Sequence, residues 1–181
     1  MRQKFDLKHV YDLEDLKKLQ KSGASADVLN QAHAMMAANN KRREKATQQL
    51  LSLGFDADPG KIKALLKLGS IPNVWDEAGR TPLHYASIIG EVEMVKCLID
   101  YGAKVNVGDK NDWTPLHYAS DLGCTETVKF LVEHGADPDV INKDNDTPLH
   151  LAKKNGNDEI VRVLEPLTFS FLPMMFVEKQ R

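Results

Sequence analysis

The sequence predicts an all-α repeat solenoid of helix-turn-helix units, with extra N-terminal helices before the array. Three observations predict this fold. The tetrapeptide Thr-Pro-Leu-His begins at Thr81, Thr114 and Thr147, and both intervals are 33 residues. A short helical pattern and then an aliphatic run with helical spacing follow each copy. A fixed period of this length is typical of supersecondary units that stack on their neighbours.

The composition fits one short repeat array. The chain has 181 residues, of which 42% are hydrophobic and 28% are charged. No stretch approaches the ~18 apolar residues of a membrane-spanning helix, and the first residues lack the apolar run of a secretory signal. Cys97 and Cys124 form no CxxC pair, which indicates reduced thiols. We therefore expect a cytoplasmic protein without a membrane span, with the nucleus as the alternative.

Charge is divided unevenly along the chain. Residues 1–75 carry 13 Lys and Arg against 8 Asp and Glu, whereas residues 76–181 carry 11 against 18. This division predicts a dipolar molecule whose halves prefer different partners, or ordinary solvated faces. The basic run from Lys41 to Lys45 lies in the positive half. It could bind an acidic partner, act as a nuclear signal, or form a solvated helix face.

Within each repeat, local signals indicate where the helices begin and end. Thr is a good N-cap, and Pro at the first helical position loses no hydrogen bond. A second helix has apolar residues such as Val92, Val95 and Leu98 on one face. Gly102 and Gly135 are expected to follow this helix in the left-handed conformation. The first helix is expected to end near a glycine in every copy, namely Gly90, Gly123 and Gly156.

An Asx-rich loop, as in "NVGDKND" and "DVINKDND", joins consecutive repeats. One position of it is occupied by Gly79, Asp112 and Asn145, residue types that tolerate a left-handed backbone. Thr-Pro-Leu-His, then Ala, a Gly, the aliphatic run and Gly-Ala-Lys-Val-Asn together resemble the ankyrin repeat family. The resemblance covers residues 76–165 and, through a degenerate copy, reaches back to about residue 46. It implies that each loop is a finger-like β-hairpin set at a right angle to the helices.

The resemblance divides the chain into six segments. Asp58 and Pro59 are expected to begin the second helix of the degenerate copy, and Ser25 a helix of the N-terminal extension. The segments are an N-terminal helical extension (1–45), a degenerate ankyrin repeat (46–75), two full repeats (76–108 and 109–141), a truncated repeat (142–166) and an apolar C-terminal tail or cap (167–181). The apolar residues of the extension with helical spacing are Leu7, Val10, Tyr11, Leu16 and Leu19, and then Val28, Ala32, Met35 and Met36.

The C-terminal segment departs from the repeat pattern. Pro166 is expected to end the last helix. Eight of the eleven residues 167–177 are large and apolar, and Leu167, Phe169 and Phe171 alternate with polar residues as in a strand. The segment is too short to cross a membrane. It is interpreted as a cap on the open end of the third repeat, or as a self-association or docking segment.

The repeated histidines have a structural interpretation. His84, His117 and His150 occupy the same place in each repeat, and neighbouring repeats stack ~10 Å apart. One metal ion, whose bonds are roughly 2 Å long, cannot hold equivalent residues at this separation. In the ankyrin family this histidine is a hydrogen-bonding residue near the start of the first helix. We therefore expect no metal site and no cofactor.

The resemblance also implies where a partner protein binds. In ankyrin proteins the variable finger positions and the exposed side of the first helix form a concave interaction surface. Carried over position by position, the candidate binding residues are Trp75, Glu77, Arg80, Ile88, Ile89, Lys110, Asn111, Trp113, Asp121, Leu122, Lys143 and Asp146. Binding energy concentrates in aromatic and Arg residues, so Trp75, Arg80, Trp113, Ile89 and Leu122 are predicted to form one patch. The alternative is that Trp113 only packs on the adjacent finger.

The sequence contains no familiar constellation of catalytic residues. A phosphate loop, an HExxH motif, a paired Cys/His cluster and a nucleophile elbow are all missing. The expected function is a non-enzymatic adaptor that binds another protein through the concave surface and the finger tips, rather than a small molecule or nucleic acid. The alternative is an assembly protein or bacterial effector that acts through its N-terminal helices or apolar tail, with the repeats as a spacer.

Overall fold

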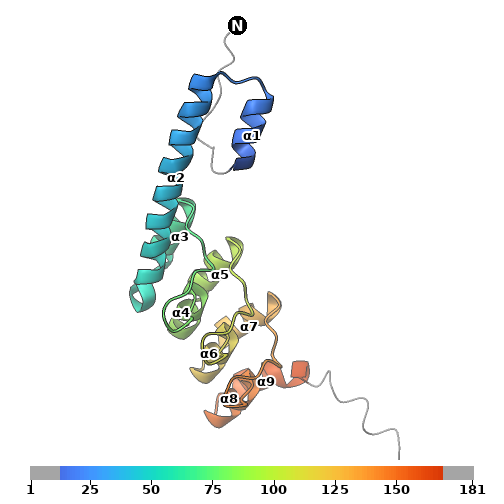
Figure 1. Cartoon of the computed structure of the whole chain (residues 1–181). Helices are drawn as coiled ribbons and strands as arrows, with labels where there is room; N and C mark the ends of the chain where they lie inside the picture. The colour runs from blue at the N-terminus through green and yellow to red at the C-terminus, as the bar shows by residue number, and fades with distance from the viewer. Residues whose placement is uncertain (1–12, 169–181) are drawn as a thin grey trace, which may run out of the picture.

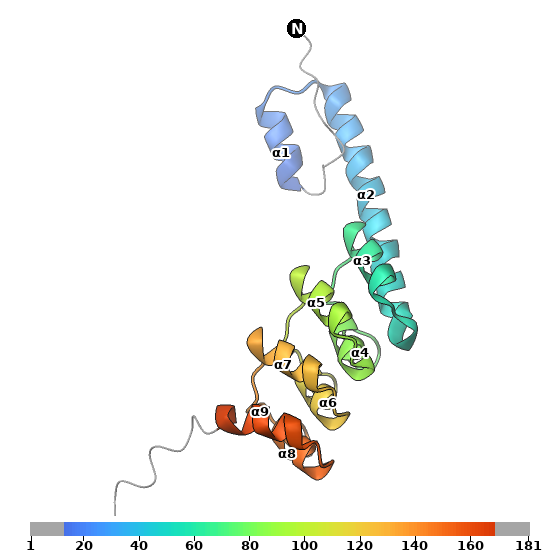
Figure 2. The same ribbon diagram turned by 180° about the vertical axis from the view of Figure 1, so that it is seen from behind.

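The computed structural model describes residues 13–168, which form an elongated array of stacked helices (Figure 1, Figure 2). From α3 onward the short helices form two layers, and each helix pair stacks on the next. The elements in chain order are α1 (Leu13–Lys21), α2 (Ala26–Leu53), the 3-10 helix η1 (Gly54–Asp56), α3 (Pro59–Lys67), α4 (Pro82–Ile89), α5 (Val92–Asp100), α6 (Pro115–Asp121), α7 (Thr125–Glu133), α8 (Pro148–Lys154) and α9 (Asp158–Thr168). The predicted all-α repeat solenoid is confirmed over these residues.

Each full repeat begins with the same capped helix. Thr81 has extended backbone angles and N-caps α4, while Pro82 occupies the first turn, where a missing N–H costs nothing. Thr114 and Thr147 cap α6 and α8 in the same way. The first of these helices ends at Gly90, whose φ of 77° is left-handed. The helix starts predicted from Thr-Pro-Leu-His are therefore confirmed in all three copies.

One continuous hydrophobic core runs through the array. It begins on α2 and α3 and reaches α9 at the other end. Leu83, Leu98, Leu116 and Leu131 lie in its middle and are fully buried. Burying one such side chain stabilises the fold by about 1.5–3 kcal/mol. Each repeat buries its apolar face against its neighbours, so the stability of one repeat depends on the repeats beside it.

The N-terminal extension and the degenerate repeat share one long helix. Ser25 N-caps α2 as predicted, and its Oγ accepts a hydrogen bond from the Val28 N–H at 3.5 Å. The helix then continues without a break through residues 45 and 46, where the boundary between the two segments was expected. Its first half packs on α1 through a small core of its own, centred on Leu16 and Ala32.

Some apolar residues of the extension do not belong to that small core. Leu19 and Met36 pack against it, whereas Met35 is exposed. The expected helical residues Leu7, Val10 and Tyr11 lie outside the residues that the structure describes. Within the described residues, the contact between α1 and α2 therefore holds the extension together.

The last helix does not end where the sequence predicts. α9 runs from Asp158 to Thr168 and contains Pro166. A proline this close to the carboxyl end removes only one helical hydrogen bond, the one to the carbonyl four residues earlier, and the last residues continue the helix. Thr168 donates its hydroxyl to the Glu165 carbonyl at 3.1 Å. Leu167 is therefore helical and not in a strand, while Phe169 and Phe171 lie outside the described residues.

The fingers are turns rather than regular β-hairpins, which corrects that part of the expected fold. In the first finger the Asp76 N–H donates to the Arg80 carbonyl at 3.0 Å, and the Gly79 N–H donates to the Asp76 carbonyl at 3.0 Å. This is a type I turn followed by a left-handed residue. The left-handed position is confirmed in the other fingers, where φ is 58° at Asp112 and 61° at Asn145. Only one backbone bond joins each finger to the next, so no strand forms in residues 13–168.

Candidate functional site

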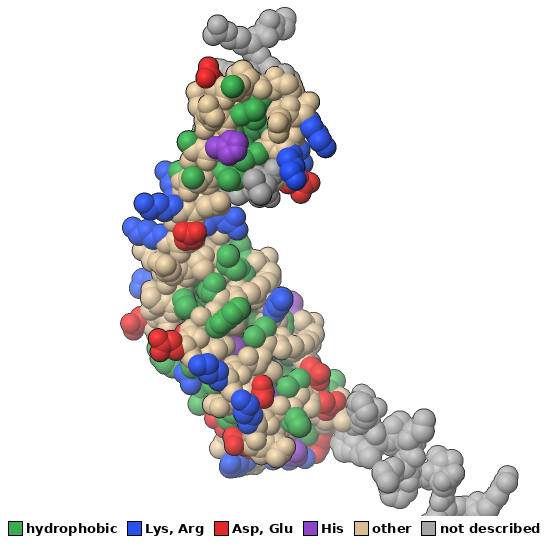
Figure 3. Space-filling model, in the orientation of Figure 1, with side chains coloured by type: hydrophobic (Ala, Val, Ile, Leu, Met, Phe, Trp, Pro, Cys, Tyr) green, Lys and Arg blue, Asp and Glu red, His purple; other side chains and the backbone are tan. Residues whose placement is uncertain are grey.

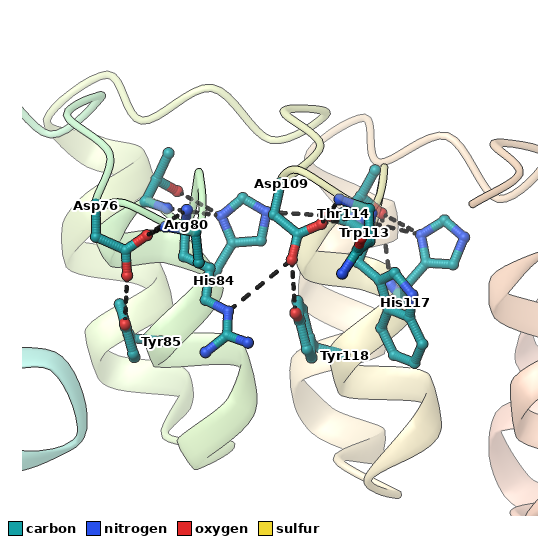
Figure 4. A network of polar contacts seen from close by, with 12 residues as sticks. Asp76, Arg80, His84, Tyr85, Asp109, Trp113, Thr114, His117 and Tyr118 are labelled. Carbon is teal, nitrogen blue, oxygen red and sulfur yellow. Dashed lines mark hydrogen bonds and ion pairs between the residues drawn. The ribbon is translucent and has the colours of Figure 1, made fainter. Parts of the chain in front are cut away.

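A buried or half-buried carboxylate organises each of the first two fingers (Figure 4). One Asp109 oxygen accepts hydrogen bonds from the Asn111 N–H at 2.8 Å and the Trp113 N–H at 3.0 Å. The other oxygen accepts the Tyr118 hydroxyl at 2.7 Å. Asp76 repeats this arrangement one period earlier and accepts the Tyr85 hydroxyl at 2.6 Å. The carboxylate therefore closes the finger and ties it to the first helix of its own repeat.

The third finger replaces both members of the carboxylate–hydroxyl pair. Asn142 stands where the other fingers have Asp, and Leu151 stands where the other helices have Tyr. The Asn142 amide oxygen still accepts the N–H groups of Asp144 and Asp146, each at 2.9 Å. Its amide nitrogen is buried and has no hydrogen-bond partner among the described residues. The backbone of the finger is kept, but its tie to α8 is lost.

Two of the repeated histidines connect adjacent repeats. His84 Nδ1 accepts the Thr81 N–H at 2.9 Å, and its Nε2 donates to the Trp113 carbonyl of the next finger at 3.0 Å. His117 makes the same bonds to Thr114 and to the Asp146 carbonyl, at 3.1 Å each. Because Nδ1 accepts from a backbone N–H, the proton of the neutral ring is on Nε2. The structural interpretation of these histidines is confirmed.

Burial sets the protonation of these two rings. Desolvation lowers the pKa of His84 below its ordinary value, although the Trp113 carbonyl and Asp109 act in the opposite direction. Desolvation lowers the pKa of His117 as well. The equivalent His150 is exposed, and its Nδ1 accepts the Thr147 N–H at 3.2 Å. The described residues contain no next finger for it to reach.

Arg80 and Trp113, which were predicted to belong to the binding patch, are half-buried between the fingers. The Arg80 guanidinium lies 5.7 Å from the centre of the Tyr118 ring, and its Nε is 3.9 Å from an Asp109 oxygen. The Trp113 ring lies 4.9 Å from the Tyr118 ring. Burial and the Asp109 carboxylate raise the pKa of Tyr118 to about 12, so its hydroxyl stays a donor. For Trp113, the geometry matches the alternative of packing within the array.

The finger tips present polar side chains. Glu77, Lys110, Asn111 and Lys143 are exposed, and Asp146 is half-buried. Their backbones form the links between fingers: the Lys110 N–H donates to the Ala78 carbonyl at 3.0 Å, and the Lys143 N–H donates to the Asn111 carbonyl at 3.1 Å. The Lys143 ammonium also donates to the Lys110 carbonyl. The backbone of the tips is therefore fixed in a row, and the side chains of Glu77, Lys110 and Asn111 extend from it into solvent.

The carboxyl ends of α4 and α6 expose apolar side chains. Ile89 is 38% exposed and Leu122 is 52% exposed at equivalent positions of adjacent repeats. Ile88 and Asp121, one residue earlier, are half-buried. The Asp121 carboxylate accepts a hydrogen bond from the Asn155 side chain at 2.6 Å, which joins α6 to the third repeat. Of the candidate residues on the first helices, Ile89 and Leu122 are the ones left largely free.

Sequence reasoning missed Phe55. This residue is 61% exposed in η1, and its ring lies edge-on to Tyr85 at 5.0 Å. It extends the apolar surface of α4 onto the degenerate repeat. The only signal in the sequence was an aromatic residue directly after a glycine, in a segment where the repeat pattern gives no alignment.

Trp75 lies apart from the finger network. Its side chain is 69% exposed on the segment that precedes the first finger, where it faces α2 across a groove. Ile141, at the equivalent place of the third repeat, is also exposed. The candidate residues thus occupy three places: the groove beside α2, the finger row and the ends of the first helices.

Metal ions and membrane spans each require a particular arrangement of side chains. Within residues 13–168, no group of three or more His, Cys, Asp and Glu side chains is placed to hold a metal ion. No helix of this part of the chain has the length and apolar character needed to span a bilayer. Cys97 and Cys124 are free thiols, and burial raises the pKa of each. A raised pKa keeps a thiol protonated and weakly reactive.

The helix pairs, capped starts and linked fingers define a repeat protein whose unit is two helices and a finger. A family model described as ankyrin repeats (3 copies) matches residues 34–142, and an ankyrin repeat model matches residues 144–164. The chain belongs to the ankyrin repeat family. Ankyrin repeats are generally protein–protein interaction modules, and the family is typically non-enzymatic. A search of curated proteins found no matching sequence.

Proposed function

We propose that this ankyrin repeat protein is a non-enzymatic adaptor that binds a partner protein through its concave surface and finger tips. The observation that carries the proposal is the exposure of Ile89 and Leu122 at equivalent ends of two adjacent first helices. Repeated apolar side chains on a surface supply binding energy when a partner covers them. Phe55 enlarges the same apolar surface toward α2.

The fingers supply a rigid frame beside this apolar row. Asp76 and Asp109 fix the first two fingers to their own helices, and His84 and the backbone bonds between tips join neighbouring fingers. A surface that is already ordered loses little conformational freedom when a partner binds. The half-buried Arg80 and Trp113 then act as supports of the surface, while Lys110, Asn111 and Lys143 offer polar contacts at its rim.

The test is an affinity pull-down with mass spectrometry on matched variants. One bait is the intact chain and the second carries Ile89→Ser and Leu122→Ser. The control bait carries Leu68→Ser and Tyr101→Ser, which change side chains of similar exposure, 59% and 41%, one period apart at the ends of α3 and α5. Circular dichroism checks that all baits fold. We expect partner proteins to be lost from the second bait and kept by the control.

A partner list shared by all three baits would remove the concave surface as the site of function. Attention would then move to residues 1–45 and 167–181, as the assembly or effector alternative requires.

We also propose the cytoplasm as the location, which the two free thiols support. Fractionation of cells that express the tagged chain would test the location.

A further inference from the structure

The first finger has an unused hydrogen-bonding edge. The three fingers begin at Asp76, Asp109 and Asn142. The second residue of a finger donates its N–H to the carbonyl of the third residue in the finger before it: Lys110 donates to Ala78, and Lys143 donates to Asn111. Glu77 is the equivalent residue of the first finger. No finger precedes it, and its N–H has no hydrogen-bond partner within residues 13–168. The edge therefore presents a backbone donor with the geometry of an inter-finger link.

An apolar groove lies beside this edge. It has a volume of about 430 Å³ and lies between α2 and residues 71–75. Leu51 forms part of one wall, while Ile71, Val74 and Trp75 form the other. Ile71 and Trp75 are 47% and 69% exposed, so two large apolar side chains here leave much of their surface open to solvent. Exposed apolar side chains that line one hollow mark an interaction site more strongly than scattered ones.

Two polar contacts hold the groove open at a fixed width. The Ile71 N–H donates to Thr47 Oγ1 at 3.0 Å, and Arg43 Nε donates to the Gly69 carbonyl at 3.2 Å. Both bonds tie the segment after α3 to α2. The long α2 therefore makes a wall that the other repeats lack, because their first helices are only seven or eight residues long. The groove is preformed, which lowers the entropic cost of binding.

The charge of the groove changes along α2. A second hollow of about 370 Å³ continues the groove past Thr47 toward Asn40 and Glu44. Lys41 and Lys45 each follow one of these lining residues, so they lie on the adjacent row of the helix and are exposed. Within the described part of the chain no ion pair involves either lysine. Figure 3 shows Lys and Arg side chains gathered around the middle of α2. Arg43 and the Glu44 carboxylate both line this second hollow, and the four cations of residues 41–45 outnumber Glu44, so this end of the groove carries a net positive charge.

We propose that this groove binds an extended peptide of a partner protein, with a large apolar side chain between Leu51 and Trp75 and acidic residues beside Lys41 and Lys45. A carbonyl of the peptide accepts the Glu77 N–H, as the Ala78 carbonyl accepts that of Lys110. The peptide thus takes the place of a preceding finger and adds to the edge of the row. This site is separate from the surface formed by Ile89 and Leu122, and the proposal for the groove does not depend on whether that surface binds a partner.

The first experiment selects ligands from a phage-displayed library of random twelve-residue peptides on the full chain. We expect enriched peptides to combine a large apolar residue with Asp or Glu at a fixed spacing. A fluorescein-labelled consensus peptide then gives affinities by fluorescence anisotropy. Raising the salt concentration should weaken binding, because the lysines are exposed and screened by ions.

Matched variants assign the peptide to the groove. Ile71→Ser with Trp75→Ser should weaken binding at least tenfold, whereas Ile141→Ser, at the position equivalent to Trp75, should leave it unchanged. Lys41→Glu with Lys45→Glu should weaken binding of the acidic peptide similarly. Glu77→Pro removes the backbone donor at a turn position that accepts proline, and should weaken binding severalfold at an unchanged melting temperature.

Several results would overturn the proposal. They are a selection without enrichment, consensus peptides without acidic residues, or binding that survives the Ile71 and Trp75 substitutions. Loss of binding in the Ile89→Ser and Leu122→Ser variant alone would move the peptide to the concave surface. A labelled peptide of residues 167–181 that competes for the groove with higher affinity would identify the occupant as a second copy of the chain. Each of these outcomes is independent of the pull-down on the concave surface.

Discussion

At the residue scale, the fingers and the links between them depend on a few polar side chains that recur in the first two repeats. Asp109 gathers two backbone donors and the Tyr118 hydroxyl, and His84 joins its own helix cap to the next finger. These groups are buried or half-buried, so a lost partner leaves a polar group away from water. Substituting one of these side chains should therefore change the free energy of unfolding by a measurable amount.

The buried histidines predict a loss of stability in mild acid. The pKa values of His84 and His117 are lowered in the folded state, so the unfolded chain takes up protons first as pH falls. Their contribution is complete above the unfolded pKa of about 6.5 and decreases below it, by up to about 1.4 kcal/mol per pH unit for each ring. Urea unfolding between pH 7.5 and 5.5 would measure the slope.

A variant with both rings replaced provides the control for this pH dependence. His84→Asn with His117→Asn should be less stable at pH 7.5 but should show a shallower decrease toward pH 5.5. Carboxylates with a lowered pKa, such as Asp76, respond to acid only at lower pH and do not interfere in this range. An unchanged slope in the double variant would show that other groups cause the effect.

The two tyrosine–carboxylate pairs should differ in strength. Tyr118→Phe removes a donor from Asp109, whose side chain is only 2% exposed, and should destabilise the chain by about 1.5–3 kcal/mol. Tyr85→Phe should cost less, because water can reach the half-buried Asp76 and replace the lost donor. Chemical denaturation of the two variants side by side would measure the difference. Equal losses would contradict the argument from burial.

At the element scale, the long α2 is the main departure from a regular array. It serves as the first helix of the degenerate repeat and also carries the contact with α1. The groove beside Trp75 exists because this helix extends past the segment that follows α3. One continuous helix therefore gives the array both its N-terminal cover and a surface that the other repeats do not have.

A pair of glycines at helix ends tests how closely the repeats pack. Gly90 and Gly156 have left-handed φ values of 77° and 71°, so an alanine at either should cost about 1 kcal/mol. A Cβ at position 90 would lie 2.7 Å from Cys124 Sγ in the next repeat, whereas a Cβ at position 156 would meet no neighbouring atom of the described residues within 4 Å. Thermal unfolding should show a larger loss for Gly90→Ala than for Gly156→Ala.

The clash itself can be isolated with a second substitution. Cys124→Ala removes the sulfur, so Gly90→Ala should cost less in that background than in the natural sequence. The same cost in both backgrounds would mean that the thiol moves aside freely.

Elements with local signals could be predicted from the sequence, and elements set by packing could not. Thr81, Pro82 and Gly90 define the start and end of α4 through their own backbone preferences, which any copy of the pattern shares. The expected boundary between residues 45 and 46 followed the repeat alignment, and α2 crosses it because no Gly or Pro lies between Ser25 and Gly54. The groove and the position of Phe55 depend on contacts between distant segments, which a local pattern does not contain.

At the scale of the whole molecule, the described residues contain two separate cores. The large core runs along the array, and the small one joins α1 to the first half of α2. Among residues 13–168, α2 is the element that contributes to both cores. Regions with few buried contacts open locally at a lower free energy than the rest of a protein.

This separation predicts independent responses to core substitutions. Leu98→Ala in the array should lower stability by about 2–5 kcal/mol. Leu16→Ala should leave the melting temperature of the array unchanged and should speed amide hydrogen exchange in α1 and the adjoining part of α2. Circular dichroism and hydrogen exchange with mass spectrometry would measure both. A lower melting temperature in the Leu16 variant would show that the two cores unfold together.

The bonds between repeats also bear on how fast the chain folds. The hydrogen bonds that His84 and Asn73 send to the next repeat each span 29 residues, and the one from Asn157 to the Ser120 carbonyl spans 37. Joining two repeats thus always closes a loop of about the same modest length, so the entropic penalty does not grow as the array lengthens. Proteins with such local connectivity fold quickly. A growing chain can complete each repeat interface soon after the next period emerges from the ribosome.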